Sequence, residues 1–325
     1  MGKKLTLGEL TAKPGEKVSG WLHIADSGLE IPVSLICGMQ DGPTVLVTGG
    51  IHNAEYVGIQ AAIELREELK PSQMRGKVIL FPLVNRTGFE HRTMSMVYED
   101  GKNINREFPG DPSGTLTEQI CHTFVDKVFP QVDYYIDLHC GDGYEELYPH
   151  VYTLGAASPK VNQASDAMAR AVNVKFRYPS QNPSGGSYNQ AGSMGVPGIL
   201  LERGGRSVWS REEVEADKED ICNVLRHLHV LEGEPEYYDT VQRKLSDGYF
   251  LIAGHTGIWY PCHHAGDRIK KGELLGVIKD YMGNIVEEYY AEASGILLIQ
   301  TVSLNVLKGG AVLFYCELKE QENSF

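Results

Sequence analysis

Four short apolar runs, each followed or ended by polar residues, constrain the fold of this chain more than any other feature. The runs are 44–48, 77–84, 132–139 and 198–201. Between them lie stretches with helical patterns, such as 56–69, and capping boxes at 115–118 and 210–213 mark two further helix starts. Two β-rich segments, 17–24 and 30–38, precede the first run. The alternation predicts an α/β fold: a mixed sheet flanked by helices.

The polar residues at the ends of these runs are those used in metal-dependent hydrolysis. They are His52 and Glu55 after 44–48, Asn85 and Arg86 after 77–84, His139 at the end of 132–139, and Glu202 after 198–201. In open α/β sheets ligands bind at the carboxyl ends of the strands. Two imidazoles and one carboxylate often hold catalytic zinc, because the fourth position stays open. We therefore expect His52, Glu55 and His139 to bind a single Zn²⁺; the alternative is a structural ion-pair cluster.

Five separated motifs also occur along the chain. They are GGIHNAEYVG (49–58), NRTGFEHRT (85–93), NINREFPGD (103–111), DYYIDLHCGD (133–142) and GILLERGG (198–205). In sequence and order they resemble the succinylglutamate desuccinylase and aspartoacylase family, a branch of the zinc carboxypeptidase fold. The resemblance covers nearly the whole chain. It implies a zinc-dependent amidohydrolase that removes an acyl group from the nitrogen of an amino acid or a related small molecule.

The resemblance also implies roles for individual residues. Glu202 is expected to be the general base and then the general acid. Arg92 is the candidate for polarising the scissile carbonyl and stabilising the oxyanion, with Arg86 as the alternative. Asn105 and Arg106 resemble the pair that binds a substrate carboxylate, for which the guanidinium fork is suited. The competing interpretations are a strand-end ion pair for Glu202, surface positions for the two arginines, and a helix-start or loop-bracing role for Asn105 and Arg106.

Two further features are predicted to support this site. Asp137 lies two residues before His139 on the same strand face, so it is placed to orient that ligand; it could equally be a buried structural carboxylate. The segment 181–195 is rich in Gly and Ser and is expected to cover the site, with Tyr188 as a substrate contact. A plain surface loop is the alternative for this segment.

The chain departs from the family's usual residues at several positions. Asn53 and Ala54 differ within the first motif and Asn103 differs within the third, but neither change removes an expected ligand. Arg203 follows Glu202 where relatives often have a small or apolar residue, and this change could alter the charge of the pocket. The substrate of the named family members is therefore not transferred to this chain.

The pattern changes after residues 233–236 to short strands broken by glycine. The expected strands are 249–253, 257–261, 273–279, 285–291, 295–302 and 311–318. They predict a smaller C-terminal β-barrel or sandwich domain, 236–325, after a zinc carboxypeptidase-like catalytic domain, 1–235. The stretch 265–272 resembles biotinyl and lipoyl carrier domains, but Tyr281-Met282-Gly283 stands where their modified lysine would be. An accessory domain without a prosthetic group is expected.

Composition limits the partners of the protein. A net charge of −13, with only 30 Lys and Arg residues, argues against a nucleic-acid partner. The six cysteines are irregularly spaced and contain no C-x-x-C pair, which favours free thiols and a cytoplasmic location. The first residues contain no long apolar segment, so neither a signal peptide nor a membrane span is expected. The sequence leaves the oligomeric state open.

The sequence as a whole favours a zinc-dependent deacylase that acts on a small N-acylated amino acid or a similar amide carrying a carboxylate. A metallocarboxypeptidase that releases a C-terminal residue would use the same kinds of residue. A β domain that narrows the cleft favours small amides over peptides. A non-catalytic binding protein on the same fold is the third alternative, and the presence of all of His52, Glu55, His139 and Glu202 argues against it.

Overall fold

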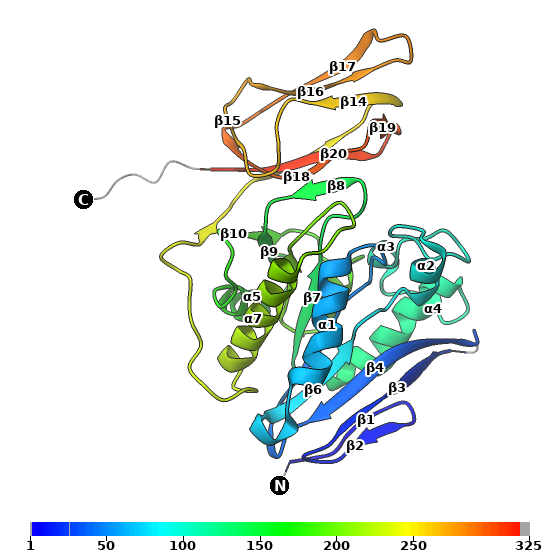
Figure 1. The fold of residues 1–325 in the computed structure, drawn as a ribbon, viewed down its shortest axis with the longest axis vertical. Helices are drawn as coiled ribbons and strands as arrows, with labels where there is room; N and C mark the ends of the chain where they lie inside the picture. The colour runs from blue at the N-terminus through cyan, green and yellow to red at the C-terminus, as the bar shows by residue number, and fades with distance from the viewer. Residues whose placement is uncertain (1, 26, 319–325) are drawn as a thin grey trace.

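A nine-stranded mixed sheet forms the centre of the computed structural model, which describes residues 2–25 and 27–318 (Figure 1). The strand order is β12-β10-β9-β11-β7-β5-β6-β4-β3. These strands are β3 (Lys17–Ile24), β4 (Leu29–Cys37), β5 (Gln40–Thr48), β6 (Arg75–Phe81), β7 (Tyr134–His139), β9 (His150–Leu154), β10 (Phe176–Ser180), β11 (Gly198–Glu202) and β12 (Arg243–Lys244). Because β11, β7, β5 and β6 run parallel to one another, their carboxyl ends meet at one edge.

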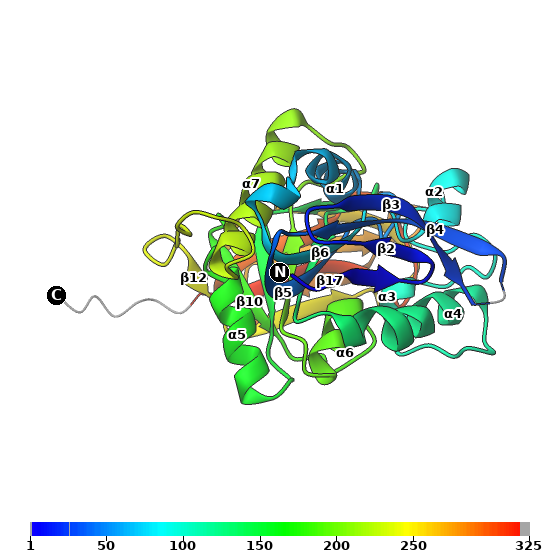
Figure 2. The ribbon, with the colours of Figure 1, turned by 90° about the horizontal axis from the view of Figure 1, so that it is seen from below.

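Helices cover both faces of this sheet. They are α1 (Tyr56–Glu68), α2 (Arg86–His91), α3 (Ile104–Glu107), α4 (Leu116–Thr123), α5 (Pro159–Ala169), α6 (Ser187–Ser193) and α7 (Arg211–His227). Figure 2 shows α1 and α7 on one side and α4 and α6 on the other. Val45 and Val47 pack into the core cluster of the α1 and α7 side, whereas Leu46 packs into the opposite cluster, as alternation along a strand requires. The predicted mixed sheet flanked by helices is confirmed.

Several predicted strand boundaries differ from the structure; β5, for example, begins at Gln40 and not at residue 44. The strand expected over 77–84 ends at Phe81, because Pro82 has no backbone N–H with which to continue the ladder. Asn85 therefore does not end a strand but caps α2, where its side chain accepts a hydrogen bond from the backbone of Gly88. Strands β9 and β10 were not anticipated. Both capping boxes are present as predicted, at Thr115 and at Ser210.

The C-terminal part is a pair of small antiparallel sheets. One has the order β13-β20-β18-β15 and the other β17-β16-β14-β19. The strands are β13 (Gly248–Ile252), β14 (Gly257–Pro261), β15 (Arg268–Ile269), β16 (Leu274–Lys279), β17 (Ile285–Tyr290), β18 (Gly295–Thr301), β19 (Asn305–Val306) and β20 (Ala311–Glu317). A core that includes the fully buried Trp259 lies within this part. The expected C-terminal β structure is confirmed, and its six longer strands lie within about one residue of the predicted positions.

The two parts of the chain exchange short strands. Strand β12 lies beyond residue 235 but pairs with β10 in the large sheet. Conversely, β8 (Glu145–Leu147) lies before residue 235 but pairs with β18 of the C-terminal sheets. Buried side chains of both parts, among them Phe176 and Phe314, also pack together in one apolar cluster. The division after residue 235 therefore remains a prediction, because β12 and β8 each pair with a strand on the other side of it. Within the described residues, no helix has both the length and the apolar character needed to cross a membrane.

Two further strands, β1 (Leu5–Leu7) and β2 (Leu10–Ala12), form a hairpin, and short helical turns lie at Pro71–Gln73, Phe124–Val128 and Phe129–Gln131. The hairpin buries Leu5, Leu7 and Ala12 in the same core cluster as α4. The hairpin and the two turns between Phe124 and Gln131 complete the core on that face, and none of these elements contributes a residue to the site described next.

Candidate metal centre and active-site cavity

Three side chains converge at the carboxyl edge of the large sheet. His52 lies in the loop that follows β5, Glu55 is the N-cap residue of α1, and His139 is the last residue of β7. The two carboxylate oxygens of Glu55 lie 2.7 Å from His52 Nδ1 and 2.9 Å from His139 Nδ1. One ligand atom from each residue falls within 4.8 Å of the others. The three ligands expected from the sequence are therefore brought together.

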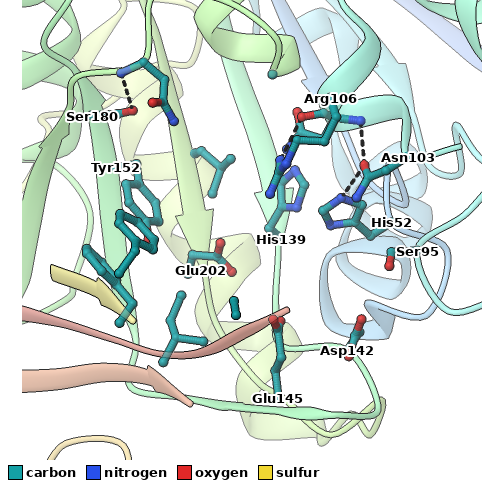
Figure 3. A pocket seen from close by; sticks show the side chains of 18 of the residues that line it. His52, Ser95, Asn103, Arg106, His139, Asp142, Glu145, Tyr152, Ser180 and Glu202 are labelled. Carbon is teal, nitrogen blue, oxygen red and sulfur yellow. Dashed lines mark hydrogen bonds between the residues drawn. The ribbon is translucent and has the colours of Figure 1, made fainter. Parts of the chain in front are cut away.

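The outer nitrogen of each histidine also faces a side-chain oxygen. His52 Nε2 lies 3.1 Å from Asn103 Oδ1 (Figure 3), and His139 Nε2 lies 3.3 Å from Asp137 Oδ2. Asp137 is fully buried and accepts hydrogen bonds from Thr48 Oγ1 and Ser187 Oγ. Such partners fix the ring orientation and the tautomer of a ligating histidine, leaving both Nδ1 atoms turned toward Glu55.

The charges at this cluster fit a divalent cation. Burial alone would raise the pKa of Glu55, but His52 and His139 outweigh it and lower that pKa to about 2. Burial opposes a charge on His139, yet the carboxylates of Asp137 and Glu55 raise the pKa of its imidazole well above the ordinary value. A metal ion would take the place of the proton between His139 Nδ1 and Glu55, and the nearby carboxylates would compensate its charge as they compensate that of the proton. The donor set of two imidazoles and one carboxylate is suited to such an ion.

Glu202 lies beside this cluster. It is the last residue of β11 and stands in register with His139 on the neighbouring parallel strand β7. Burial raises the pKa of Glu202 well above its ordinary value; His139 opposes this rise, whereas the carboxylates of Glu55 and Glu145 add to it. A carboxyl group with a raised pKa can both accept and donate a proton near neutral pH.

A cavity of about 690 Å³ contains this cluster and extends to the β domain. Its polar part is lined by His52, Glu55, His139 and Glu202, with Arg106 on one side and Asp142 and Glu145 on the other (Figure 3). Its apolar part is lined by aromatic and aliphatic residues of β9, β10, β13 and β20. The volume lies within the range of roughly 300–1,000 Å³ that is typical of small-molecule sites.

Most of the expected substrate contacts line this cavity. Asn105 and Arg106 belong to the short helix α3, and Asn105 Oδ1 accepts a hydrogen bond of 2.8 Å from the backbone of Ser187. Tyr188 lines the cavity from α6, although most of its ring is packed into the core. The segment 181–195 thus borders the cavity, and part of it is the helix α6 rather than a loop.

The structure does not bring Arg86 and Arg92 to the cavity. Arg86 lies 3.4 Å from Glu90 and its guanidinium sits 5.5 Å from the ring of Trp21. Arg92 is the C-cap of α2, with a left-handed φ of 56°, and its side chain is exposed. Within the described part of the chain, the lining of the cavity contains one arginine, Arg106.

Arg203 also turns away from the cavity. Its Nε lies 2.9 Å from Asp217, and a second nitrogen contacts Asp220, both on α7. The suggestion that Arg203 alters the charge of the pocket is therefore not supported, because its guanidinium is paired with Asp217 and Asp220 on α7 and does not line the cavity.

Sequence reasoning did not identify Asn103, Asp142 or Glu145 as lining residues. Asn103 was visible as a departure from the family's third motif, and Asp142 lies within the turn after His139. Glu145 carried no signal, because a short acidic segment after a turn is usually exposed. Its position depends on the pairing of β8 with the β domain.

Comparisons with known proteins identify relatives that share the fold of nearly the whole chain. A curated relative, N-alpha-acetyl-L-2,4-diaminobutyric acid deacetylase of Halomonas elongata, is 28% identical over 302 residues, which cover 89% of this chain and 86% of that protein. A succinylglutamate desuccinylase/aspartoacylase structure from Rhodobacter sphaeroides matches with a TM-score of 0.82 at 27% identity, covering 94% of this chain and 96% of that one. The product-bound ectoine utilization protein EutE (DoeB) of Ruegeria pomeroyi matches with a TM-score of 0.83 at 26% identity, covering 93% and 95%.

The family model for the succinylglutamate desuccinylase/aspartoacylase catalytic domain matches residues 41–228. This range contains all three candidate ligands, Glu202, and both Asn105 and Arg106. The chain belongs to the succinylglutamate desuccinylase/aspartoacylase family.

Proposed function

We propose that this protein is a zinc-dependent deacylase that hydrolyses the amide bond of a small N-acylated amino acid or a related amide carrying a carboxylate. The observation that carries the proposal is the convergence of His52, Glu55 and His139 beside Glu202 in one cavity. The relative from Halomonas elongata, named for the deacetylation of an N-acetyl diamino acid, supports the reaction class.

Different residues of this chain have different roles in the proposed hydrolysis. His52, Glu55 and His139 would hold a zinc ion, which would supply a nucleophilic water near neutral pH and polarise the amide carbonyl. Glu202 accepts the proton of the attacking water and passes it to the departing amine. Asn105 and Arg106 hold the carboxylate of the substrate, which sets the amide against Glu202. Arg92 has no part in this scheme, because its exposed side chain lies outside the cavity lining.

Replacing Glu202 tests the proposal at the proton-transfer step. Glu202→Gln keeps the shape of the side chain but cannot accept a proton, so kcat should fall on the order of 100- to 10,000-fold. The zinc content, measured by atomic absorption, should remain that of the parent. His139→Ala should instead lose the metal together with the activity.

Glu288→Gln is the matched control, because Glu288 is an exposed glutamate on β17 of the β domain. It should retain the turnover of the parent protein. Full turnover by the Glu202→Gln protein would show that another group is the base.

A further inference from the structure

Part of the cavity is apolar, and the roles proposed for the residues of hydrolysis leave this part unexplained. Tyr152 of β9, Tyr178 of β10, Phe250 of β13 and Phe314 of β20 line it. Phe250 stacks on Phe314 with ring centroids 4.0 Å apart, and Tyr178 meets Phe314 edge to face at 5.4 Å. The ring of Tyr152 lies 6.2 Å from that of Phe314 and 5.8 Å from that of Tyr178. These four connected rings are called the aromatic wall below.

Strand β13 presents large apolar side chains to the cavity without covering them. Phe250 and Ile252 both line the cavity, and they are 55% and 48% exposed. Tyr249 and Leu251 alternate with them along the strand and pack against the core of the β domain. Removing a phenylalanine and an isoleucine from water is favourable, and inside a cavity a ligand can do this. The surface of β13 therefore fits an apolar ligand group.

The charges of the cavity also favour an uncharged group at the aromatic wall. Among the described residues, the basic side chains that line the cavity are the two histidines of the metal centre and Arg106. Figure 3 shows Arg106 and Tyr152 on opposite sides of His139 and Glu202. A second carboxylate at the aromatic wall would therefore lose its hydration without gaining a cationic partner. Glu145 supplies little negative charge either, because burial raises its pKa to about 8 and leaves this carboxyl mostly protonated at neutral pH.

The order of groups along the cavity places the apolar group on the acyl side of the amide. In an N-acyl amino acid, the scissile carbonyl carbon joins the acyl group to the nitrogen of the portion that carries the carboxylate. With that carboxylate at Arg106 and the amide at Glu202, the acyl group extends toward Tyr152, on the side away from Arg106. This step rests on the proposed deacylase function, which fixes where the amide lies.

We propose that the aromatic wall is the subsite for the acyl group and that it selects N-acyl amino acids whose acyl group is large and apolar. An acetyl group would leave most of the wall in contact with water, whereas a phenyl ring or a longer alkyl chain would cover it. Aromatic rings also pack favourably against one another in stacked and edge-to-face arrangements, which the four rings of the wall already use among themselves. A phenylacetyl group represents this class in the test.

The test compares two ligands that differ only in the acyl group, N-phenylacetyl-L-alanine and N-acetyl-L-alanine. Their binding is measured by calorimetry with the zinc-loaded Glu202→Gln protein, in which cleavage is too slow to interfere. Because a phenyl ring is buried, the phenylacetyl ligand should bind about 10- to 100-fold more tightly. Adding Phe250→Ala should reduce this preference on the order of tenfold and leave the affinity for the acetyl ligand unchanged.

Tyr290→Ala, in the same Glu202→Gln protein, is the matched control. Tyr290 is an aromatic residue of β17 that is 50% exposed and lies outside the cavity lining. This variant removes a ring of similar exposure from the same β domain, and it should keep the full preference for the phenylacetyl ligand. An equal loss of preference in the Tyr290→Ala and Phe250→Ala proteins would overturn the proposal, because the loss would then not depend on the aromatic wall.

Turnover by the parent protein separates the subsite from the deacylase function. The parent should cleave N-phenylacetyl-L-alanine with a higher kcat/KM than N-acetyl-L-alanine. A binding preference that depends on Phe250 supports the apolar subsite even if neither amide is cleaved, in which case the proposed deacylase function alone fails. Equal affinities for the two ligands, no measurable binding of either, or a preference that survives Phe250→Ala would overturn the inference, whether or not the amides are cleaved.

Discussion

His150 is a buried histidine on β9, opposite Glu202 of the adjacent antiparallel strand. Its Nδ1 lies 2.7 Å from the carbonyl oxygen of Tyr148, which makes Nδ1 the donor. Burial lowers the pKa of His150 to about 4, against the opposing effect of this hydrogen bond. The unfolded chain binds a proton near pH 6.5, so stability should fall as the pH drops from about 6.5 toward 4.

Replacing this histidine should remove part of the acid sensitivity of the fold. Between pH 7 and pH 5 the parent should lose about 2 kcal/mol more of its unfolding free energy than His150→Asn, whose amide can still donate to Tyr148. Urea unfolding at the two pH values measures the difference. Equal losses in both proteins would mean that His150 is protonated as easily in the folded state as in the unfolded one.

The positions of single residues could be predicted from the sequence where these residues lie at the end of a strand. The sequence places His139 and Glu202 at the ends of apolar runs, and register then puts them side by side. Arg86 and Arg92 could not be placed, because they begin and cap the short helix α2, and the direction of a side chain there depends on the local turn. Asn103 could not be assigned either, since its contact with His52 depends on a loop that folds across 51 residues of sequence.

At the scale of elements, Arg203 ties the end of β11 to α7. The residue is 9% exposed and pairs with Asp217 and Asp220, which are more deeply buried. Removing one partner of a buried ion pair leaves a charge without compensation, so Arg203→Leu should destabilise the protein by about 3–5 kcal/mol. Denaturant unfolding of the variant measures this cost.

A compensated variant distinguishes charge from packing. If the cost arises from the two carboxylates that lose their cationic partner, adding Asp217→Asn and Asp220→Asn to Arg203→Leu should recover much of the lost stability. A triple variant no more stable than the single one would show that the packing of the Arg203 side chain, and not its charge, connects β11 to α7.

Element prediction succeeded where the local signals were strong. The capping boxes at Thr115 and Ser210 begin α4 and α7, because their hydrogen bonds are formed within one turn of helix. Strand β10 was missed because it contains Pro179, and a proline argues against a strand inside a sheet. The predicted end of β6 was wrong for a related reason, since Pro82 stops the ladder after Phe81.

At the scale of the whole molecule, the β domain completes the cavity proposed as the active site. Strand β8 joins it to the catalytic part, and β13 and β20 supply part of the apolar wall. The sequence predicts the strands of this domain but not the pairing of Glu146 with Gln300, because a segment of three residues carries no pattern that selects a partner 154 residues away. The part of the cavity wall that lies opposite Arg106 could therefore not be predicted from the sequence.

Release of free amine from a panel of N-acyl amino acids and short peptides, with and without a chelator, tests the central claim most directly. The zinc-loaded protein should cleave the N-acyl amino acids, lose this activity in the chelator, and regain it when zinc is returned. Cleavage that persists in the chelator after the metal has been removed would contradict the metal centre. Cleavage confined to peptides would contradict the deacylase function.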